Sequence, residues 1–146
     1  MADYDVIVIG AGPGGYVCAI RAAQLGKKTA IIDREWLGGV CLNVGCIPSK
    51  ALLRNAELAY ILRKRSADFG LHMEGLTLDY SVAVKRSRQV SDRLVKGVGF
   101  LMKKNGVEVH TGTAVVEKPG AVSVTAADGS RKTLTANDVI LATLTG

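Results

Sequence analysis

The stretch that decides the fold is VIVIGAGPGG at residues 6–15. Its first four residues are apolar and β-branched, which is typical of a central parallel strand buried on both faces. The next residues match G-x-G-x-x-G at Gly10, Gly12 and Gly15, and an alanine-rich stretch over residues 16–25 then predicts a helix that ends at Gly26. The glycine pattern therefore lies between a strand and a helix, the context in which it is informative.

A second strand is predicted at residues 27–32, and it ends on Asp33, which lies 18 residues beyond Gly15. An acidic residue about 20 residues after the glycines binds a ribose hydroxyl in dinucleotide-binding βαβ units. Gly10 allows the tight turn, Gly12 leaves room for a pyrophosphate, and Gly15 lets the helix pack closely on the strand, while amides at the helix N-terminus face the phosphates. These residues predict a dinucleotide site and leave open whether the ligand is FAD or NAD. Asp33 favours an unphosphorylated ribose in either case.

The overall composition is that of one globular domain. The chain has 146 residues, of which 48% are hydrophobic and 22% charged, enough for one core but not for two catalytic domains. The 17 glycines concentrate at residues 10–15 and 38–45, which indicates close approach of the backbone to a ligand. No apolar run reaches the ~18 residues that a membrane helix requires, and the acidic start, MADYD, is unlike a targeting peptide. We therefore expect a cytoplasmic protein without a membrane segment.

The basic residues behind the net charge of +6 concentrate in one segment. Between residues 85 and 104 lie seven basic side chains opposed only by Asp92: Lys85, Arg86, Arg88, Arg93, Lys96, Lys103 and Lys104. The one aromatic residue among them is Phe100, so the stacking platform of a nucleic-acid site is missing. This pattern predicts the solvated face of a helix and no nucleic-acid partner.

The second glycine burst leads into GGVCLNVGCIPSK at residues 38–50. Its two cysteines, Cys41 and Cys46, follow a C-x-x-x-x-C spacing, whereas zinc sites use tighter pairs and a second ligand pair. The other candidate ligands have no ligand spacing among them: Cys18, His72 and His110. No metal site is predicted, and Cys18 in the first helix is interpreted as a small core residue.

Helix geometry limits how Cys41 and Cys46 can interact. In a regular α-helix, residues five apart have Cα atoms roughly 8–9 Å apart, beyond the ~7 Å limit for a disulfide. A bridge would therefore require a distorted segment, and Gly45 is the expected place for it. Lys50 lies four residues after Cys46 on the same helix face, where its ammonium would favour a thiolate. Two buried structural cysteines remain the alternative to a redox pair.

The segment from residue 38 to residue 53 closely resembles the redox-active segment of the flavin disulfide reductases. The run CLNVGCIPSKALL at residues 41–53 is most similar to the dihydrolipoamide dehydrogenase branch, while glutathione and mercuric reductases share the framework but differ around the Ile, Ser and Ala-Leu-Leu positions. Two residues depart from the family pattern: Val40 stands where Thr is common, and Asp33 where Glu is more usual. By this resemblance, the first would remove a side-chain contact to the cofactor, and the second would shorten the reach to the ribose.

The resemblance implies FAD as the cofactor and gives roles to the site residues. Cys41 and Cys46 would form the only disulfide, a reducible one, with Cys41 as the thiol that meets substrate and Cys46 as the sulfur beside the flavin. Lys50 would supply positive charge near the isoalloxazine. The catalytic residues expected are these three. The expected cofactor-binding residues are Gly10, Gly12, Gly14, Gly15, Asp33, Arg34, Gly39, Val40, Cys41, Gly45, Cys46, Lys50, Ala114 and Thr143.

Two further helices are predicted after the cysteines. The first covers residues 49–65 and places four apolar residues on one side: Leu52, Ala56, Ala59 and Leu62. The second lies within residues 77–104 and is ended by the Asn-Gly pair at residues 105–106. We expect the two helices to pack as an antiparallel pair.

Strands follow in the last third of the chain. The segments 107–117, 121–126 and 132–135 are rich in β-formers and punctuated by Pro-Gly and Asp-Gly, which predicts an antiparallel meander, and residues 139–142 return to a buried parallel-strand pattern. This order resembles the FAD domain of the family. The expected fold is α/β, a Rossmann-like FAD-binding parallel sheet with a small antiparallel meander, and residues 1–146 are expected to form one FAD-binding domain.

The sequence contains one dinucleotide fingerprint. Residues 97–99 read Gly-Val-Gly but are followed by Met102 where a third glycine would be. Family members typically read Ala-Thr-Gly after the last predicted strand, whereas here Leu144 follows the Ala-Thr of residues 142–143. We therefore expect the N-terminal portion of a longer flavoprotein, truncated before the NAD and interface domains.

The parent activity implied by the resemblance is oxidation of protein-bound dihydrolipoamide, with electrons passing through Cys41 and Cys46 to FAD and then to NAD. The implied partner is the lipoyl domain of a 2-oxoacid dehydrogenase complex, and the implied parent is a homodimer. The 146 residues alone are expected to bind FAD weakly and not to turn over. The alternatives are another disulfide reductase, of the glutathione or mercuric type, and a non-catalytic FAD-binding fragment.

Overall fold

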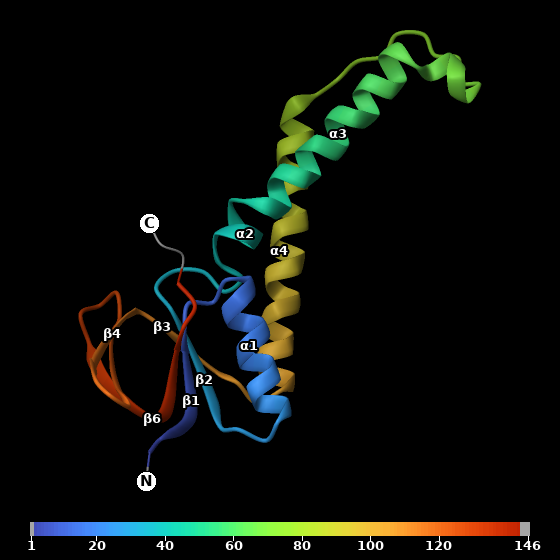
Figure 1. Ribbon diagram of the computed structural model, residues 1–146. Helices are drawn as coiled ribbons and strands as arrows, with labels where there is room; N and C mark the ends of the chain where they lie inside the picture. Colours follow the sequence, from blue (N-terminus) through green and yellow to red (C-terminus); the bar gives the residue numbers. More distant parts are fainter. Residues whose placement is uncertain (1, 144–146) are drawn as a thin grey trace.

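The computed structural model describes residues 2–143, so Leu144 and its departure from the family pattern lie outside the described residues. The six strands are β1 (Tyr4–Ile9), β2 (Thr29–Asp33), β3 (Glu108–Thr111), β4 (Thr113–Lys118), β5 (Ala121–Thr125) and β6 (Arg131–Leu141). They form one sheet in the order β3-β2-β1-β6-β5-β4, parallel from β3 to β6 and antiparallel from β6 to β4 (Figure 1). The expected architecture, a parallel sheet with a small antiparallel meander, is confirmed.

Strand β1 is buried on both faces because two different layers cover it. On one face, Val6 and Val8 pack with residues of the helices α1 (Pro13–Gln24) and α4 (Tyr80–Lys104), including Ala19, Val98 and Met102. On the other face, Ile7 and Ile9 pack with Val122 and Val124 of the meander, as the opposite placement of helices and β4 in Figure 1 shows. Each fully buried aliphatic side chain contributes about 1.5–3 kcal/mol, so the apolar run predicted as a central strand fixes the middle of the molecule.

Both helices that follow a glycine segment begin three residues earlier than the sequence pattern predicted. Helix α1 begins at Pro13 rather than at residue 16, and helix α3 (Cys46–Lys64) begins at Cys46 rather than at residue 49. Pro13 and Pro48 explain the difference, because proline in the first turn of a helix lacks an N–H that would have no partner there. The end of α1 follows the prediction, since Gly26 takes a left-handed φ of +80° just beyond it.

Helices α3 and α4 run antiparallel and form an arm that extends beyond the sheet, with the short helix η1 (Ser66–Phe69) near its tip (Figure 1). The prediction for the apolar side of α3 is wrong at one position, because Ala56 is exposed. Asn55 is partly buried in its place, on the same side of the helix as the partly buried Leu52, Ala59 and Leu62. The Asn55 side chain accepts a hydrogen bond from Arg86 of α4 at 3.2 Å, which favours this rotation of the helix.

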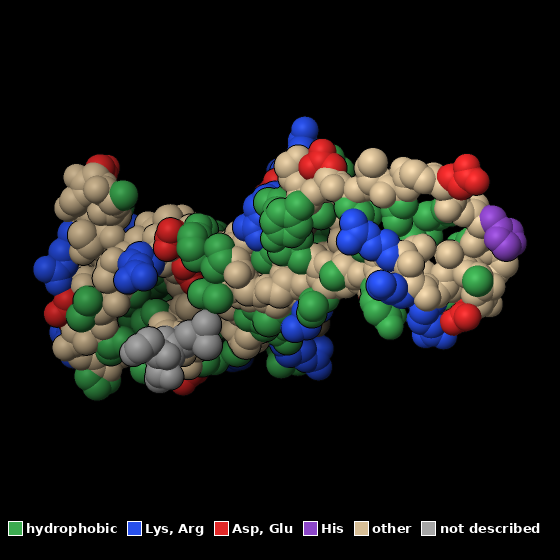
Figure 2. All heavy atoms as spheres, turned by 90° about the horizontal axis from the view of Figure 1, so that it is seen from above, with side chains coloured by type: hydrophobic (Ala, Val, Ile, Leu, Met, Phe, Trp, Pro, Cys, Tyr) green, Lys and Arg blue, Asp and Glu red, His purple; other side chains and the backbone are tan. Residues whose placement is uncertain are grey.

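The basic face of α4 is solvated, as predicted. All seven Lys and Arg side chains between residues 85 and 104 are exposed, while Ser87, Ser91, Val98 and Met102 form the buried side of the helix. In the view of Figure 2, Lys and Arg side chains lie in several separate groups with hydrophobic surface between them.

Two predictions about the strands are wrong. The segment 107–117 is not one strand, because the chain leaves the parallel sheet at Gly112, whose φ of +155° brings it close to Thr125 of β5; an added Cβ would lie 2.6 Å from the Thr125 carbonyl oxygen. The segments 132–135 and 139–142 are one strand, β6, which pairs with β5 through its first half and with β1 through its second. A single strand therefore joins the meander to the parallel sheet.

The end of β6 is parallel as predicted but not buried. Val139 is half-buried, while the side chains of Ile140 and Leu141 are 37% and 68% exposed. The apolar pattern here matches that of β1, yet β1 lies between two covering layers, and the described residues do not cover Leu141. Periodicity in the sequence cannot distinguish these two situations.

Candidate functional site

The glycine-rich turn joins β1 to α1 by close backbone contacts. Gly10 has a φ of +103°, and a Cβ there would lie 2.5 Å from the carbonyl oxygen of Ala142. A Cβ on Gly15 would lie 1.7 Å from the Gly10 carbonyl oxygen, so only glycine lets α1 pack this closely on the strand. Gly12 differs from both, because no atom lies within 4 Å of its Cβ position. The space above Gly12 is therefore left open at the N-terminus of α1, where backbone N–H groups lack helical partners.

An open cleft of about 350 Å³ lies at the carboxyl ends of β1, β2 and β6, where parallel α/β sheets bind ligands. It is lined by Ile9, Gly10, Gly12, Ile32, Asp33, Arg34, Glu35, Trp36, Gly39, Val40, Gly112, Thr113, Ala114, Ala142 and Thr143. A neighbouring hollow of about 400 Å³ shares Arg34, Gly112 and Thr113 with it. The predicted cofactor residues that line the cleft are Gly10, Gly12, Asp33, Arg34, Gly39, Val40, Ala114 and Thr143. The predicted residues that do not line it are Gly14, Gly15, Cys41, Gly45, Cys46 and Lys50.

Asp33 has a role that its position in the sequence did not reveal. One carboxylate oxygen accepts the backbone N–H of Ala11 at 2.7 Å, and the other accepts the N–H groups of Glu35 and Trp36 at 3.0 and 3.1 Å. The carboxylate thus ties the glycine-rich turn to the loop after β2, and it lines the cleft at the same time. Its predicted contact with a ribose stays a prediction.

The segment of residues 38–53, named the redox segment for its resemblance, packs directly on the glycine-rich turn. Gly38 donates its N–H to the Ala11 carbonyl oxygen at 2.8 Å, and Gly39, with a φ of +61°, places its Cβ position only 2.7 Å from the Cα of Gly12. The helix α2 (Gly39–Asn43) starts at this contact, and Asn43 at its end donates to the carbonyl oxygens of Leu37 and Gly39. The glycines at residues 38–39 are therefore explained by the close packing of their backbone against that of the glycine-rich turn.

The predicted break between the two cysteines lies at Val44 and Gly45, which separate α2 from α3. A Cβ on Gly45 would lie 2.9 Å from the carbonyl oxygen of Val40, so glycine lets the two helices meet at this close corner. Cys41 on α2 and Cys46 on α3 are thereby brought into side-chain contact. The backbone therefore departs from a regular helix at Gly45, where the sequence placed the expected distortion.

The cysteines themselves are thiols in the structure. All three are unpaired within the described residues, so the structure shows the dithiol form of the Cys41–Cys46 pair, and the predicted disulfide form stays a prediction. A hydrogen bond between the two thiols raises the pKa of Cys41, and burial raises it further, while the Cys46 backbone amide and the Lys50 ammonium partly offset the increase. Cys46 is exposed and Cys41 half-buried. Cys18 packs against the helix-side core, as predicted.

An arginine that sequence reasoning missed lies beside the redox segment. Arg88 of α4 donates to the backbone carbonyl oxygen of Asn43 at 2.8 Å, and so satisfies a carbonyl at the end of α2. The two residues are 45 positions apart, so no local pattern could have revealed the contact.

Within residues 2–143, no group of three or more His, Cys, Asp or Glu side chains is arranged to hold a metal ion. No helix in the same residues has the length and apolar character needed to cross a membrane.

Comparison with known proteins identifies the family. The family model described as "Pyridine nucleotide-disulphide oxidoreductase" matches residues 4–143. The chain is 54% identical over 144 residues to a protein of Mycobacterium tuberculosis (strain H37Rv) named "Dihydrolipoyl dehydrogenase", a match covering 98% of this chain and 31% of the relative. Proteins of the same name from Corynebacterium glutamicum and Rhizobium etli are 53% and 58% identical, over 96% and 84% of this chain and 30% and 25% of each relative. The chain spans about a third of the length of these relatives, and it belongs to the pyridine nucleotide-disulphide oxidoreductase family.

Proposed function

We propose that this chain is the FAD-binding, redox-cysteine portion of a dihydrolipoyl dehydrogenase. One observation carries the proposal: the cleft that begins above Gly12 extends to Val40, and the next residue, Cys41, is in side-chain contact with Cys46. The cleft at the glycine-rich turn and the dithiol pair are thus adjacent along the chain. The shared name of the relatives favours the lipoamide branch over the glutathione and mercuric reductases.

The residues of the cleft fit FAD. The open space at Gly12 and the N-terminal amides of α1, including those of Gly14 and Gly15, suit a pyrophosphate. Asp33, Arg34 and Ala114 would bind the adenosine end, and Gly39, Val40, Gly45, Thr143 and the cysteines would lie toward the flavin. FAD supplies a two-electron acceptor when it is bound, and NAD would take those electrons in the full-length enzyme.

The cysteine pair would oxidise a dithiol by thiol–disulfide exchange. With the pair in its disulfide form, a substrate thiolate attacks Cys41 Sγ, a mixed disulfide forms, and Cys46 leaves as a thiolate. The second substrate thiol then attacks the mixed disulfide and releases Cys41. The substrate loses two electrons and two protons and becomes a disulfide, and the pair becomes the dithiol. The contact between the two free thiols in the structure belongs to that reduced form.

Lys50 would favour thiolates during this exchange. It follows Cys46 by one helical turn, and its ammonium acts to lower the pKa of Cys41. The reduced pair and the reduced flavin both carry negative charge, so a nearby cation stabilises both.

The substrate, the oligomeric state and the cellular location that we propose follow from the same assignment. The substrate would be the lipoyl domain of a 2-oxoacid dehydrogenase complex, the full-length enzyme a homodimer, and the location the cytoplasm, where thiols are kept reduced. Residues 1–146 would act as one FAD-binding domain.

Titration of the purified chain with FAD tests the proposal, followed by flavin absorbance and by chromatography of the released nucleotide. We expect binding of FAD and none of NAD. Gly12→Val should abolish binding without unfolding the chain, because its side chain would project into open space in the cleft. Gly97→Ala in α4, which also has no neighbour within 4 Å, is the matched control and should bind as the parent does.

A substrate comparison then separates the branches of the family. Dihydrolipoamide should reduce the oxidised cysteine pair faster than glutathione does. Binding of NAD without flavin, or FAD binding unaffected by Gly12→Val, would contradict the assignment.

A further inference from the structure

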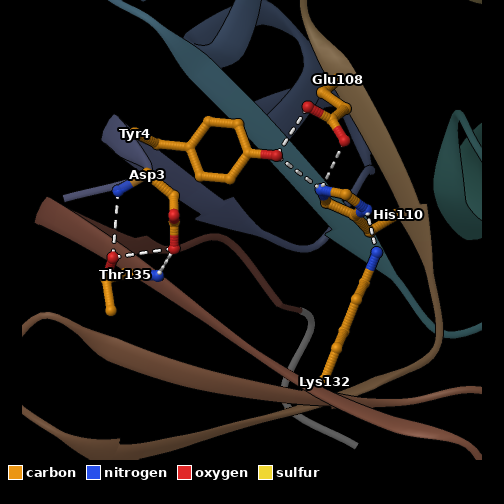
Figure 3. Close-up of polar contacts among 6 residues, drawn as sticks. All are labelled: Asp3, Tyr4, Glu108, His110, Lys132 and Thr135. Atoms are coloured by element: carbon orange, nitrogen blue, oxygen red, sulfur yellow. Dashed lines mark hydrogen bonds and ion pairs between the residues drawn. The ribbon is translucent and has the colours of Figure 1, made fainter.

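A polar cluster lies between the parallel sheet and the meander, with Tyr4 and His110 buried at its centre and Glu108 and Lys132 exposed at its edges (Figure 3). His110 of β3 and Tyr4 of β1 are only 7% and 6% exposed. Tyr4 Oη lies 2.6 Å from Glu108 Oε2 and 3.0 Å from His110 Nε2, and Lys132 Nζ of β6 lies 2.6 Å from His110 Nδ1. The cluster therefore connects three strands, two from the parallel part of the sheet and one from the meander.

The chemistry of the four groups fixes where the protons lie. The Lys132 ammonium can only donate, so Nδ1 of His110 must be unprotonated and the ring proton is on Nε2. Nε2–H donates to Tyr4 Oη, and the Tyr4 hydroxyl donates to Glu108. This directed chain is complete only when His110 is neutral.

The charges around His110 agree with this arrangement. Burial and then the Lys132 ammonium lower the pKa of His110 from its ordinary value of 6.5. Glu108 opposes them, because its Oε1 lies 3.4 Å from His110 Nε2 and would form an ion pair with the protonated ring. Burial and the bond to Glu108 raise the pKa of Tyr4, so the phenol keeps its proton. Lys28 lies 5.3 Å from the centre of the Tyr4 ring, and the β2 residue paired with His110 is the apolar Ile32.

The cluster lies next to one wall of the cleft. Two residues after His110 the chain leaves β3 at Gly112 and enters β4, and Gly112, Thr113 and Ala114 line the cleft opposite the glycine-rich turn. Strand β3 pairs only with β2, and β4 only with β5, among the described strands. The His110–Lys132 bond therefore ties the edge strand to the meander close to this wall.

We propose that the chain Lys132–His110–Tyr4–Glu108 positions the wall formed by residues 112–114, and releases it when His110 takes up a proton. A protonated His110 cannot accept from Lys132, and two cations then face each other across the layers. His110 is a positioning residue for the adenosine end of the cleft. The proposal rests on the proposed function for its ligand, while the movement of the wall itself can be measured without one.

The ligand arm of the test uses FAD titrated into the 146-residue chain between pH 5 and pH 8. The dissociation constant should be constant above pH 7 and rise about 3- to 10-fold toward pH 5, the range expected for loss of one or two hydrogen bonds. The His110→Phe variant should bind FAD about 3- to 10-fold more weakly at pH 7.5. The part of the pH dependence that is due to His110 should be lost, so that any dependence that remains belongs to other groups. Lys132→Met should also weaken binding, whereas Lys132→Arg, which keeps a donor, and Lys118→Met on exposed β4 should not.

The ligand-free arm uses hydrogen exchange of the Gly112 amide, which donates to the Asp33 carbonyl oxygen at 2.9 Å. After correction for intrinsic rates, exchange of the Gly112 amide should become faster in the parent chain as the pH is lowered. At pH 7.5 it should be faster in Lys132→Met than in the parent chain. Normal exchange in Lys132→Met, or a pH step of unchanged size in His110→Phe, would overturn the proposal. Failure of FAD to bind at pH 7.5 would instead contradict the proposed function and leave this second arm to decide.

Discussion

Replacing Gly39 by alanine should destabilise the chain more than a glycine-to-alanine substitution whose only cost is an unfavourable backbone conformation. Gly39 has a φ of +61°, where an L-residue costs about 1–2 kcal/mol. Its new Cβ would also lie 2.7 Å from Gly12 Cα and 3.1 Å from Gly12 N, both backbone atoms that cannot rotate away. Forced displacement of packed groups costs about 1–3 kcal/mol. Together these effects predict a loss of about 2–5 kcal/mol in the free energy of unfolding, a large share of the ~5–15 kcal/mol of a typical domain.

Urea denaturation followed by circular dichroism measures this loss, with two matched controls. Gly26→Ala has a φ of +80° but no neighbour within 4 Å, so it carries the conformational cost alone, about 1–2 kcal/mol. Gly97→Ala carries neither cost and should be neutral or stabilising by up to about 1 kcal/mol, because alanine is the better helix former. An unchanged m-value would show that a shifted urea midpoint reports a change in stability. If Gly39→Ala lost no more than Gly26→Ala, the contact between the redox segment and the glycine-rich turn would not have the importance assigned to it.

Three further predictions concern single side chains. Lys50→Met should raise the pKa of the Cys41 thiol, slow its alkylation at pH 8 and make the oxidised pair harder to reduce, as measured by iodoacetamide kinetics and by equilibration with glutathione. Asp33→Asn should cost about 1–3 kcal/mol of stability in thermal or urea unfolding, because an amide nitrogen cannot accept the backbone N–H groups that the carboxylate now accepts. Hydrogen bonds from Thr135 lower the folded pKa of Asp3, so its stabilisation is present above the unfolded pKa of about 3.9 and is lost as pH falls through the folded value; urea midpoints between pH 2 and pH 6 should show this step reduced in Thr135→Val.

The dinucleotide-binding unit could be predicted because its signals are local. The apolar strand, the glycines and the second strand follow one another within residues 6–33, and each glycine acts on backbone close by in the sequence or at the neighbouring strand end. The break at Gly45 was predictable for a similar reason, since helix geometry alone limits residues that are five apart.

The parts that could not be predicted depend on residues far apart in the chain. Gly112 divides one β-rich segment into two strands because Thr125 lies against it, and nothing near Gly112 indicates this contact. Strand β6 continues through the polar Asn137 and Asp138, because Asp138 pairs with Val6 of β1. The sequence located Asp33 correctly but could not show that its carboxylate holds the Ala11 amide.

The polar cluster of Figure 3 shows the same limit. Tyr4 and His110 are 106 residues apart, and each is unremarkable in its own segment. Their relation exists only once β3 is placed beside β2 and the meander closes over the sheet.

Peptide-mapped alkylation of the FAD-loaded chain, before and after addition of dihydrolipoamide, tests the central claim most directly. In the oxidised chain only Cys18 should be labelled among the three cysteines. After dihydrolipoamide is added under anaerobic conditions, Cys41 and Cys46 should become labelled and one equivalent of lipoamide disulfide should form for each pair reduced. A cross-link that includes Cys18, or a Cys41–Cys46 pair that dihydrolipoamide does not reduce in the folded protein, would contradict the redox role assigned to this site.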